Sequence, residues 1–445
     1  MKKFPNALVI MVGFILFSTL LTYIIPHGSY ERISNEITNQ VNVVPNSYHV
    51  VDAEPVSIFQ MFLAVPEGII ERADLIALIL LIGGCFYVLE KTGALKEGIE
   101  YLTSILKGKE EVALILVSLV FLTGGALSGL QEEIIAMTPV LLYLSSRLGY
   151  NAFVAVGISY GSAILGASFS PINPFAVVIA QRETELAFLS GSVFRLITMA
   201  IAFAIWMYMI IRYANKNRIA KKIEEVEHKK AKLSGRNILI LALVAFAFVI
   251  LIYGMLKLEW GFNEMTAEFF VLGILVGLIG KLGINGTSEA YIEGFKELIF
   301  AGIIVGLSSS ISIILEKGMI IDSIIYGLFI PMEHLPKSLS AISMMISQAL
   351  LHLPVPSYSG QAVLTMPILA PLSDLIGISR QVCVLAYQYG AVMMDLLIPT
   401  NGSLMAVIAI AGISFDKWFK FALKLVLVIM GVGAAAIIVA IYTGL

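Results

Sequence analysis

The chain has 445 residues, of which 58% are hydrophobic and only 13% charged, with a formal net charge of −2. Its mean hydropathy is +0.91, which no water-soluble domain would tolerate on its surface. Many segments reach the roughly 20 apolar residues that one helical crossing needs, which excludes a single-anchor protein and a β-barrel. We therefore expect an all-α polytopic membrane protein.

The first apolar run, "MKKFPNALVIMVGFILFSTLLTYIIPHG", resembles a signal peptide but is longer and has no small-residue cleavage site after it. It predicts a retained first membrane helix over 7–26. The polar loop 27–55 carries only one basic residue, Arg32, whereas 212–236 is the most basic segment of the chain. By the positive-inside rule, the loop lies outside and the basic segment lies in the cytoplasm of a bacterial inner membrane.

The remaining apolar runs predict further crossings and two interrupted segments. The runs at 111–146 and 339–376 contain Gly, Pro, Ser and Gln at their middles, so we expect them to form re-entrant helical hairpins with polar tips. The number of full crossings places the N-terminus inside and the C-terminus outside. The full crossings are expected at 7–26, 73–90, 152–180, 191–212, 237–256, 267–283, 298–315, 380–409 and 421–442.

An internal repeat relates the two halves of the chain. "LEKTGAL" from Leu89 recurs as "LEKGMII" from Leu315, and the pair Glu67-Gly68 recurs at the same offset. Further on, "SPINPF" matches "IPTNGS", which pairs Pro171 with Pro399 and Asn173 with Asn401. Because matching spans cross in opposite directions, the repeat is inverted, a pattern typical of secondary transporters with a binding site near the midplane.

The repeat defines the expected domain organisation. We expect 1–66 to hold the first membrane helix and the outside loop, 67–212 the first repeat, 213–236 a basic cytoplasmic linker, 237–292 scaffold helices, and 293–445 the second repeat. Each repeat contains one hairpin and one broken helix, at 111–146 and 152–180 in the first, and at 339–376 and 380–409 in the second.

Both broken helices and both hairpin tips carry polar groups that can bind a solute or an ion. Prolines unwind the helix, so that free carbonyls can coordinate a cation and the next helix N-terminus can hold a carboxylate; the alternative is a pair of simple proline kinks. In the tip "SGLQEEII" the two carboxylates are costly at membrane depth unless protonated, paired or bound to a cation, the alternative being a solvent-facing interfacial pair. The candidate substrate-binding residues are Ser128, Gln131, Glu132, Glu133, Asn173, Ser357, Ser359, Gln361, Thr400, Asn401 and Ser403. The candidates for binding a coupling ion or proton are Glu132, Asp395, Ser170, Pro171, Pro399 and Gly402.

Three further ionisable residues lie in apolar surroundings. Asp395, four residues before Pro399, is a proton carrier, a cation ligand or a counter-charge, or else forms a structural salt bridge. His352 either titrates or is a hydrogen-bonded polar residue. Arg195 falls at a span end, where long side chains extend to the interface, so we expect it to set helix register rather than touch substrate. The site region contains carboxylates but no lysine or arginine, which suits a zwitterionic or cationic solute, or cation-coupled uptake of an anion.

The sequence contains no nucleotide-binding motif, metal-ligand cluster or nucleophile–base arrangement. We therefore expect no enzyme activity, no cofactor and no metal beyond coupling sodium ions or protons, and no nucleic-acid partner. The expected function is secondary transport of a small carboxylate-bearing solute, driven by a cation gradient or by exchange. A cation/proton antiporter or channel without an organic substrate is the alternative.

Several motifs together resemble the YfcC-like carriers of the DcuC/ArcD group in the ion-transporter superfamily. They are "LTYIIPHGSYER", "LEKTGAL", "QEEIIAMTPVL", "SPINPFAVVIAQ", "SGSVFR", "SGQAVLTMPILAPLSDLIGISRQVCVLAYQYG" and "PTNGSLMAVIAIAGI", in order along nearly the whole chain. The resemblance implies a homodimer with a scaffold domain at the interface and a transport domain that moves as an elevator. It also implies four-carbon dicarboxylates or exchanged basic amino acids as substrates, with sodium coupling in some relatives. The chain departs from the pattern in "YGAVMMDLLIPTNG", where the acid is displaced to Asp395.

Overall fold

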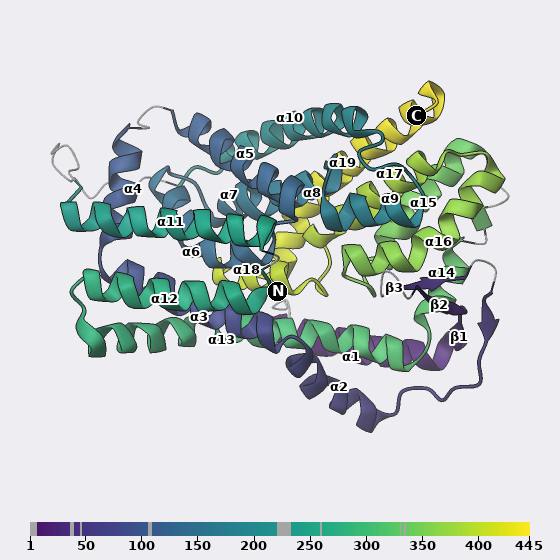
Figure 1. Ribbon diagram of the computed structural model, residues 1–445, viewed down its shortest axis with the longest axis horizontal. Helices are drawn as coiled ribbons and strands as arrows, with labels where there is room; N and C mark the ends of the chain where they lie inside the picture. Colours follow the sequence, from purple (N-terminus) through teal and green to yellow (C-terminus); the bar gives the residue numbers. More distant parts are fainter. Residues whose placement is uncertain are drawn as a thin grey trace.

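The computed structural model describes residues 7–35, 40–44, 47–105, 109–219, 233–258, 260–329, 331–332 and 335–445. Within them, seven helical segments are long and apolar enough to cross a membrane, and two shorter apolar helices cover Met11–Ile24 and Gly235–Leu251. The longest helices lie roughly along the long axis of the molecule (Figure 1). This confirms the expected mainly helical, multi-spanning architecture. The seven segments are Ala73–Lys91, Glu110–Leu127, Ala152–Glu183, Ser192–Lys216, Phe262–Ile279, Leu298–Lys317 and Phe415–Thr443.

The N-terminal part consists of one helix and a loop with short strands. Helix α1 covers Ala7–Ile24. In the loop that follows, β1 (Gly28–Ser29) pairs with β4 (His49–Val50), and β2 (Arg32–Asn35) with β3 (Gln40–Val43), both antiparallel. The loop is tied to the end of a distant helix, since Gly28 N donates to Met319 O at 2.9 Å.

The first half of the helical region contains one broken helix. The expected crossing at 152–180 is interrupted between Phe169 and Pro174, and the amphipathic helix α2, which begins with a Ser57/Gln60 capping box, was not predicted. The elements are α2 (Ile58–Glu71), α3 (Ala73–Lys91), α4 (Ala94–Ile105), α5 (Glu110–Ser128), α6 (Glu132–Arg147), α7 (Ala152–Val156), the π-helix η1 (Gly157–Gly161), α8 (Ser162–Phe169), the π-helix η2 (Pro174–Val178), α9 (Ile179–Glu183) and α10 (Ser192–Lys216).

The second half also contains a helix pair followed by a broken helix. The pair is α15 (Lys337–Leu351) with α16 (Tyr358–Ile376), and its counterpart in the first half is α5 with α6. The predicted linker 213–236 begins within α10 and ends within α11, and its centre, 220–232, lies outside the described residues. The elements are α11 (Gly235–Lys257), α12 (Phe262–Ile279), α13 (Gly283–Lys317), α14 (Ile321–Phe329), α15 (Lys337–Leu351), α16 (Tyr358–Ile376), α17 (Arg380–Ala391), the 3-10 helix η4 (Val392–Leu396), α18 (Gly402–Ile410) and α19 (Phe415–Thr443).

Glycines allow α3 and α13 to pack closely in antiparallel directions. A Cβ atom at Gly84 would lie 2.1 Å from Tyr291, and one at Gly83 would lie 2.3 Å from Leu298. Towards the start of α3 the contacts continue farther along α13, where Gly302 faces Ile76. Small residues permit such approach without a hydrophobic driving force between helices in lipid.

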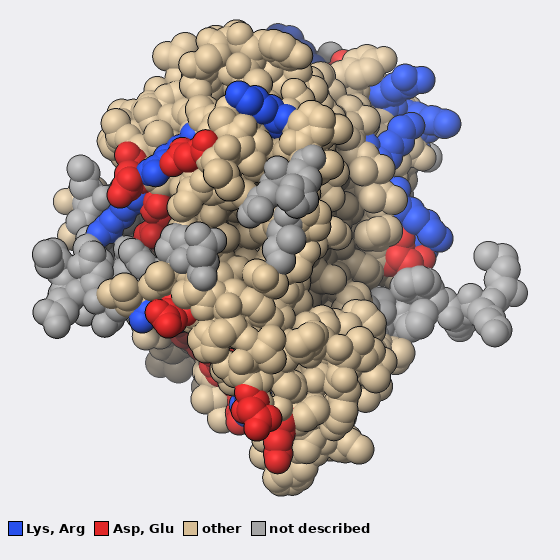
Figure 2. Space-filling view, turned by 90° about the vertical axis from the view of Figure 1, so that its right-hand side faces the viewer, with Lys and Arg blue, Asp and Glu red and all other residues tan. Residues whose placement is uncertain are grey.

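Glycines also allow one helix of each helix pair to pack closely against a broken helix. A Cβ at Gly125 on α5 would lie 2.0 Å from the carbonyl oxygen of Ala163 on α8, and one at Gly390 on α17 would lie 2.1 Å from that of Met345 on α15. The end of each helix pair is thereby fixed beside a broken helix. At the end of the molecule that carries α14 and α16, charged side chains form separate groups on a mostly uncharged face (Figure 2).

Candidate functional site

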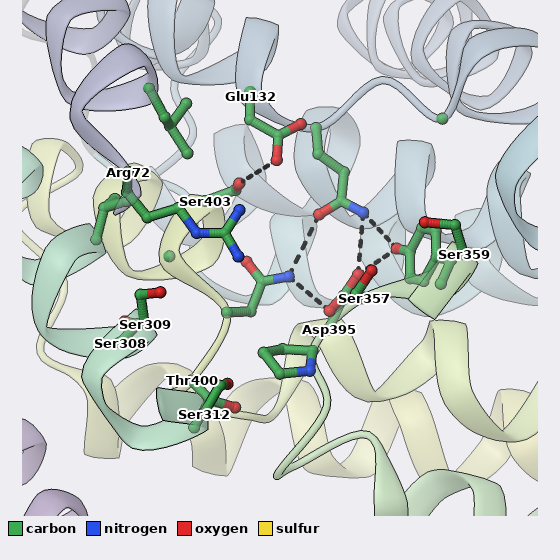
Figure 3. A pocket seen from close by; sticks show the side chains of 18 of the residues that line it. Arg72, Glu132, Ser308, Ser309, Ser312, Ser357, Ser359, Asp395, Thr400 and Ser403 are labelled. Carbon is green, nitrogen blue, oxygen red and sulfur yellow. Dashed lines mark hydrogen bonds between the residues drawn. The ribbon is translucent and has the colours of Figure 1, made fainter. Parts of the chain in front are cut away.

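A cavity of about 330 Å³ lies beside the break between η4 and α18 (Figure 3). The turn between α5 and α6 and the turn between α15 and α16 also border it, and residues of α3 and α13 line its other side. Hydroxyl and amide groups dominate its polar lining. The lining residues are Arg72, Leu75, Gly129, Gln131, Glu132, Phe175, Phe262, Val305, Ser308, Ser309, Ser312, Pro356, Ser357, Tyr358, Ser359, Asp395, Thr400, Asn401, Gly402 and Ser403.

An asparagine caps the helix after each break. Asn401 Oδ1 accepts from Leu404 N at 2.8 Å at the start of α18, and Asn173 Oδ1 accepts from Ala176 N at 2.8 Å at the start of η2. Asparagine is a favoured N-cap because its short side chain reaches the free amides of the first turn. The two caps differ in surroundings, since Asn401 lines the cavity while Asn173 is fully buried and donates to Gly125 O at 2.8 Å.

Four side chains lie within hydrogen-bond distance of the Asp395 carboxylate. Oδ1 accepts from Asn401 Nδ2 at 2.5 Å and contacts His352 Nε2 at 2.9 Å. Oδ2 accepts from Gln131 Nε2 at 3.0 Å and from the Tyr358 hydroxyl. Asp395 is only 1% exposed, so this network supplies the stabilisation that water cannot.

Gln131 connects the first tip to the second break. Its Oε1 accepts from Tyr160 OH at 3.1 Å and from Asn401 Nδ2 at 3.3 Å. Tyr160 belongs to η1, so residues from both halves of the chain hold one another in place. Tyr160 was not predicted as a site residue, although it lies in the predicted broken helix 152–180.

The two adjacent glutamates have different surroundings. Glu132 lines the cavity and its Oε1 accepts from Ser403 Oγ at 3.1 Å. Glu133 is buried, and its Oε2 accepts from Gln131 N at 3.1 Å, which stabilises the start of α6. Glu132 therefore faces the cavity and Glu133 supports the turn.

Arg72 places a positive charge in the cavity, so the expectation that the site region holds no lysine or arginine is wrong. Arg72 lies between α2 and α3, one residue before the predicted span 73–90. Its guanidinium extends towards the region of Ser403 (Figure 3). The adjacent Glu71 Oε1 lies 3.8 Å from its Nη2, a long and half-exposed contact that leaves the fork of N–H donors available.

Arg195 is fully buried rather than extended to the membrane interface, which corrects the expectation for this residue. Its Nε donates to Gln388 Oε1 at 3.1 Å and its Nη2 donates to Gln381 Oε1 at 2.9 Å. Gln388 in turn donates to Ser170 O at 2.8 Å. Buried amide oxygens satisfy the guanidinium in place of water, and the chain of bonds links the first break to α17.

The other predicted site residues divide into two groups. Gln131, Glu132, Ser357, Ser359, Asp395, Thr400, Asn401, Gly402 and Ser403 line the cavity, whereas Glu133, Asn173, Gln361, Ser170, Pro171 and Pro399 do not. The side chain of Ser128 lies outside the described residues. Ser170 stabilises the first break by accepting from Asn173 N at 2.7 Å, and Gln361 contacts His352.

The arrangement can hold a small charged organic molecule. The N-termini of α6, α16 and α18 meet at the cavity, where their free amides favour a carboxylate, and Arg72 adds a full positive charge. Asp395 and Glu132 supply negative charge in the same space. Among the described residues, no group of three or more His, Cys, Asp or Glu side chains is placed to hold a metal ion.

Comparison with known proteins identifies a family. Residues 4–442 match the family model for DcuC, the C4-dicarboxylate anaerobic carrier. An uncharacterized protein from Haemophilus influenzae is 30% identical, with 98% of this chain and 97% of that protein covered. The putative basic amino acid antiporter YfcC from Escherichia coli is 28% identical, with 94% and 92% covered. The solved YdaH transporter of Alcanivorax borkumensis aligns over 99% of both chains at 14% identity, with a TM-score of 0.45. The chain therefore belongs to the DcuC family of C4-dicarboxylate carriers, as the sequence motifs indicated, and is a multi-pass membrane transporter.

Proposed function

We propose that this transporter carries a small carboxylate-bearing solute, an amino acid or a dicarboxylate, and that a cation gradient or exchange drives it. One observation carries the proposal: Arg72 and the N-termini of α6, α16 and α18 lie on the same cavity as the carboxylates of Glu132 and Asp395. A solute carboxylate would bind the guanidinium fork and the free helix amides, both of which suit a planar anion.

The charge distribution favours an amino acid over a dicarboxylate. An amino group would pair with Glu132 or Asp395, whereas a second carboxylate would need a bound cation to offset repulsion there. The name of the relative YfcC, a putative basic amino acid antiporter, agrees with the first candidate. The family name supports the second, so both belong in the same substrate screen.

We propose an elevator mechanism in a homodimer with an inverted repeat, two re-entrant hairpins and two broken helices. The antiparallel packing of α3 and α13 and the matching caps Asn173 and Asn401 support the inverted repeat. A second cavity of about 740 Å³ lies between the same helix α3 and the helices α6 and α18, with Glu90, Lys96 and Ser146 in its lining. Cavities along one interface are what alternating access by sliding would use.

The basic segment 212–236 supports an orientation in the inner membrane with the N-terminus in the cytoplasm. In that orientation the site cavity lies near the outer ends of α3 and α12, because Arg72 and Phe262 line it. The second cavity lies towards the cytoplasm.

Solute counterflow in proteoliposomes tests the proposal. Vesicles loaded with unlabelled arginine, ornithine, succinate or fumarate are diluted into the labelled solute at equal pH and sodium on both sides. We expect transient accumulation of at least one of them, dependent on Arg72. If no organic solute accumulates but the protein dissipates a proton or sodium gradient, the alternative antiporter or channel replaces the proposed function.

A further inference from the structure

We infer that His352 and Asp395 together form a proton-binding site, and that this proton is the ion coupled to transport. The inference deepens and rests on the proposed function, since it names the coupling ion of the same site. It follows from the hydrogen bonds around the pair, which leave a place for one proton and only one.

The orientation of Gln361 fixes one side of the histidine. Gln361 Nε2 donates to the backbone oxygen of Gln348 at 2.8 Å, and because that oxygen can only accept, the amide cannot be reversed. Its Oε1 therefore faces His352 Nδ1, at 2.6 Å. An amide oxygen only accepts, so Nδ1 must carry a hydrogen.

The orientation of Asn401 fixes the other side in the same way. Its Oδ1 accepts from the backbone amide of Leu404, so its Nδ2 points to Asp395 Oδ1 and donates there. Gln131 and Tyr358 donate to Oδ2. These neighbours all act as donors, so an ionised carboxylate satisfies each of them without a hydrogen of its own.

The contact between His352 Nε2 and Asp395 Oδ1, 2.9 Å long, then decides the proton count. A neutral histidine with its hydrogen on Nδ1 would set a bare nitrogen against a carboxylate oxygen, two lone pairs at hydrogen-bond distance. One added proton on either atom removes the conflict and makes the pair neutral overall. A buried site of low dielectric favours that neutral state over a single unpaired negative charge.

Other ionisable groups surround the pair on every packed element. Tyr358 on α16 and Tyr160 on η1 belong to the hydrogen-bond network, and Tyr387 on α17 donates to the backbone oxygen of Tyr358 at 2.6 Å. Glu132 on α6 and Arg72 before α3 line the same cavity as Asp395. Of these groups, only the His352–Asp395 pair has two facing atoms that both lack a hydrogen when the pair is unprotonated.

The location of the pair couples the proton to a solute. Asp395 lines the cavity while His352 is fully buried behind it, so a proton arrives at the carboxylate and is retained by the imidazole. Asn401 both lines the cavity and donates to Asp395. A solute that accepts a hydrogen bond from the Asn401 amide therefore weakens the hydrogen bond from Asn401 to the carboxylate. Two ligands that share a group in this way change each other's affinity.

Proton movement during solute transport tests the inference. Wild type, His352→Gln and His49→Gln are reconstituted with the pH dye pyranine inside the vesicles, His49 being an exposed histidine of β4. We expect solute-driven proton flux in wild type and His49→Gln, and a fall of at least ten-fold in the ratio of proton flux to solute transport in His352→Gln. Proton flux at the wild-type ratio to solute in His352→Gln would overturn the proton site.

A measurement without solute separates this inference from the proposed function. The unfolded chain has an ionised aspartate and a histidine that is neutral above pH ~6.5, so it binds fewer protons than the folded pair and stability should fall as pH rises. We expect the melting temperature of wild type and His49→Gln to fall more steeply above that pH than that of His352→Gln or Asp395→Asn. Parallel profiles in all four proteins would overturn the proton site even if solutes are transported, and absent counterflow with divergent profiles would overturn only the proposed function.

Discussion

The guanidinium of Arg195 donates its Nε hydrogen to Gln388 Oε1 at 3.1 Å, in a place where neither side chain reaches solvent. Because Gln388 also donates to Ser170 O at 2.8 Å, the start of α10, the middle of α17 and the first break are held together. This link crosses from the first half of the chain to the second.

Replacing Arg195 with Met should destabilise the protein strongly. The change leaves the side-chain oxygens of Gln388 and Gln381 without their donor, and each unsatisfied buried group costs about 1–3 kcal/mol. We expect a large drop in melting temperature in detergent. The exposed Arg182 provides the matched control, and Arg182→Met should melt like wild type. Equal melting of the two variants would contradict a structural role for Arg195.

Alanine substitution of the two capping asparagines should separate stability from transport. Each substitution removes an N-cap, at a cost of about 1 kcal/mol. Only Asn401→Ala also removes a side chain that lines the cavity and supports Asp395. We expect Asn401→Ala to abolish solute counterflow with a folded protein, and Asn173→Ala to keep it in the fraction that folds. Normal counterflow by Asn401→Ala would count heavily against the site.

Much of this site can be predicted from the sequence, because each break and each tip is marked by residues that are close together in the chain. Prolines within apolar runs predict the breaks, and Asp395 stands out as an acid in an apolar run. Arg72 and Ser308 could not be found in this way, since they lie far in sequence from the tips and the breaks and reach the cavity only through the packing of α3 and α13. The burial of Arg195 was not predicted because its hydrogen-bond partners, Gln381 and Gln388, lie far away in sequence. The residues around Arg195 at its helix end do not indicate these partners.

Arg72 should recognise a carboxylate by its shape as well as its charge. Arg72→Lys keeps the charge but loses the planar fork, so we expect apparent solute affinity in counterflow to fall about ten-fold or more, the range given by hydrogen bonds to charged groups. A matching loss should occur when the wild type is offered the carboxamide form of its solute. If Arg72→Lys and Arg72→Ala both keep wild-type affinity, the solute carboxylate binds elsewhere.

Close backbone contact between α5 and α8 should make Gly166 intolerant of any side chain. A Cβ there would lie 2.0 Å from Leu122 O and 3.1 Å from Ala126 N, and these backbone atoms cannot rotate away. Gly166→Ala must therefore separate the helices near the first tip, at a cost of about 1–3 kcal/mol or more. Gly13 on α1 is the control, because a Cβ added there would meet no atom within 4 Å, and Gly13→Ala should melt at or slightly above the wild-type temperature. Equal thermal shifts in the two variants would show that α5 and α8 do not pack as closely as described, and the positions of Gln131 and Asn173 would then need revision.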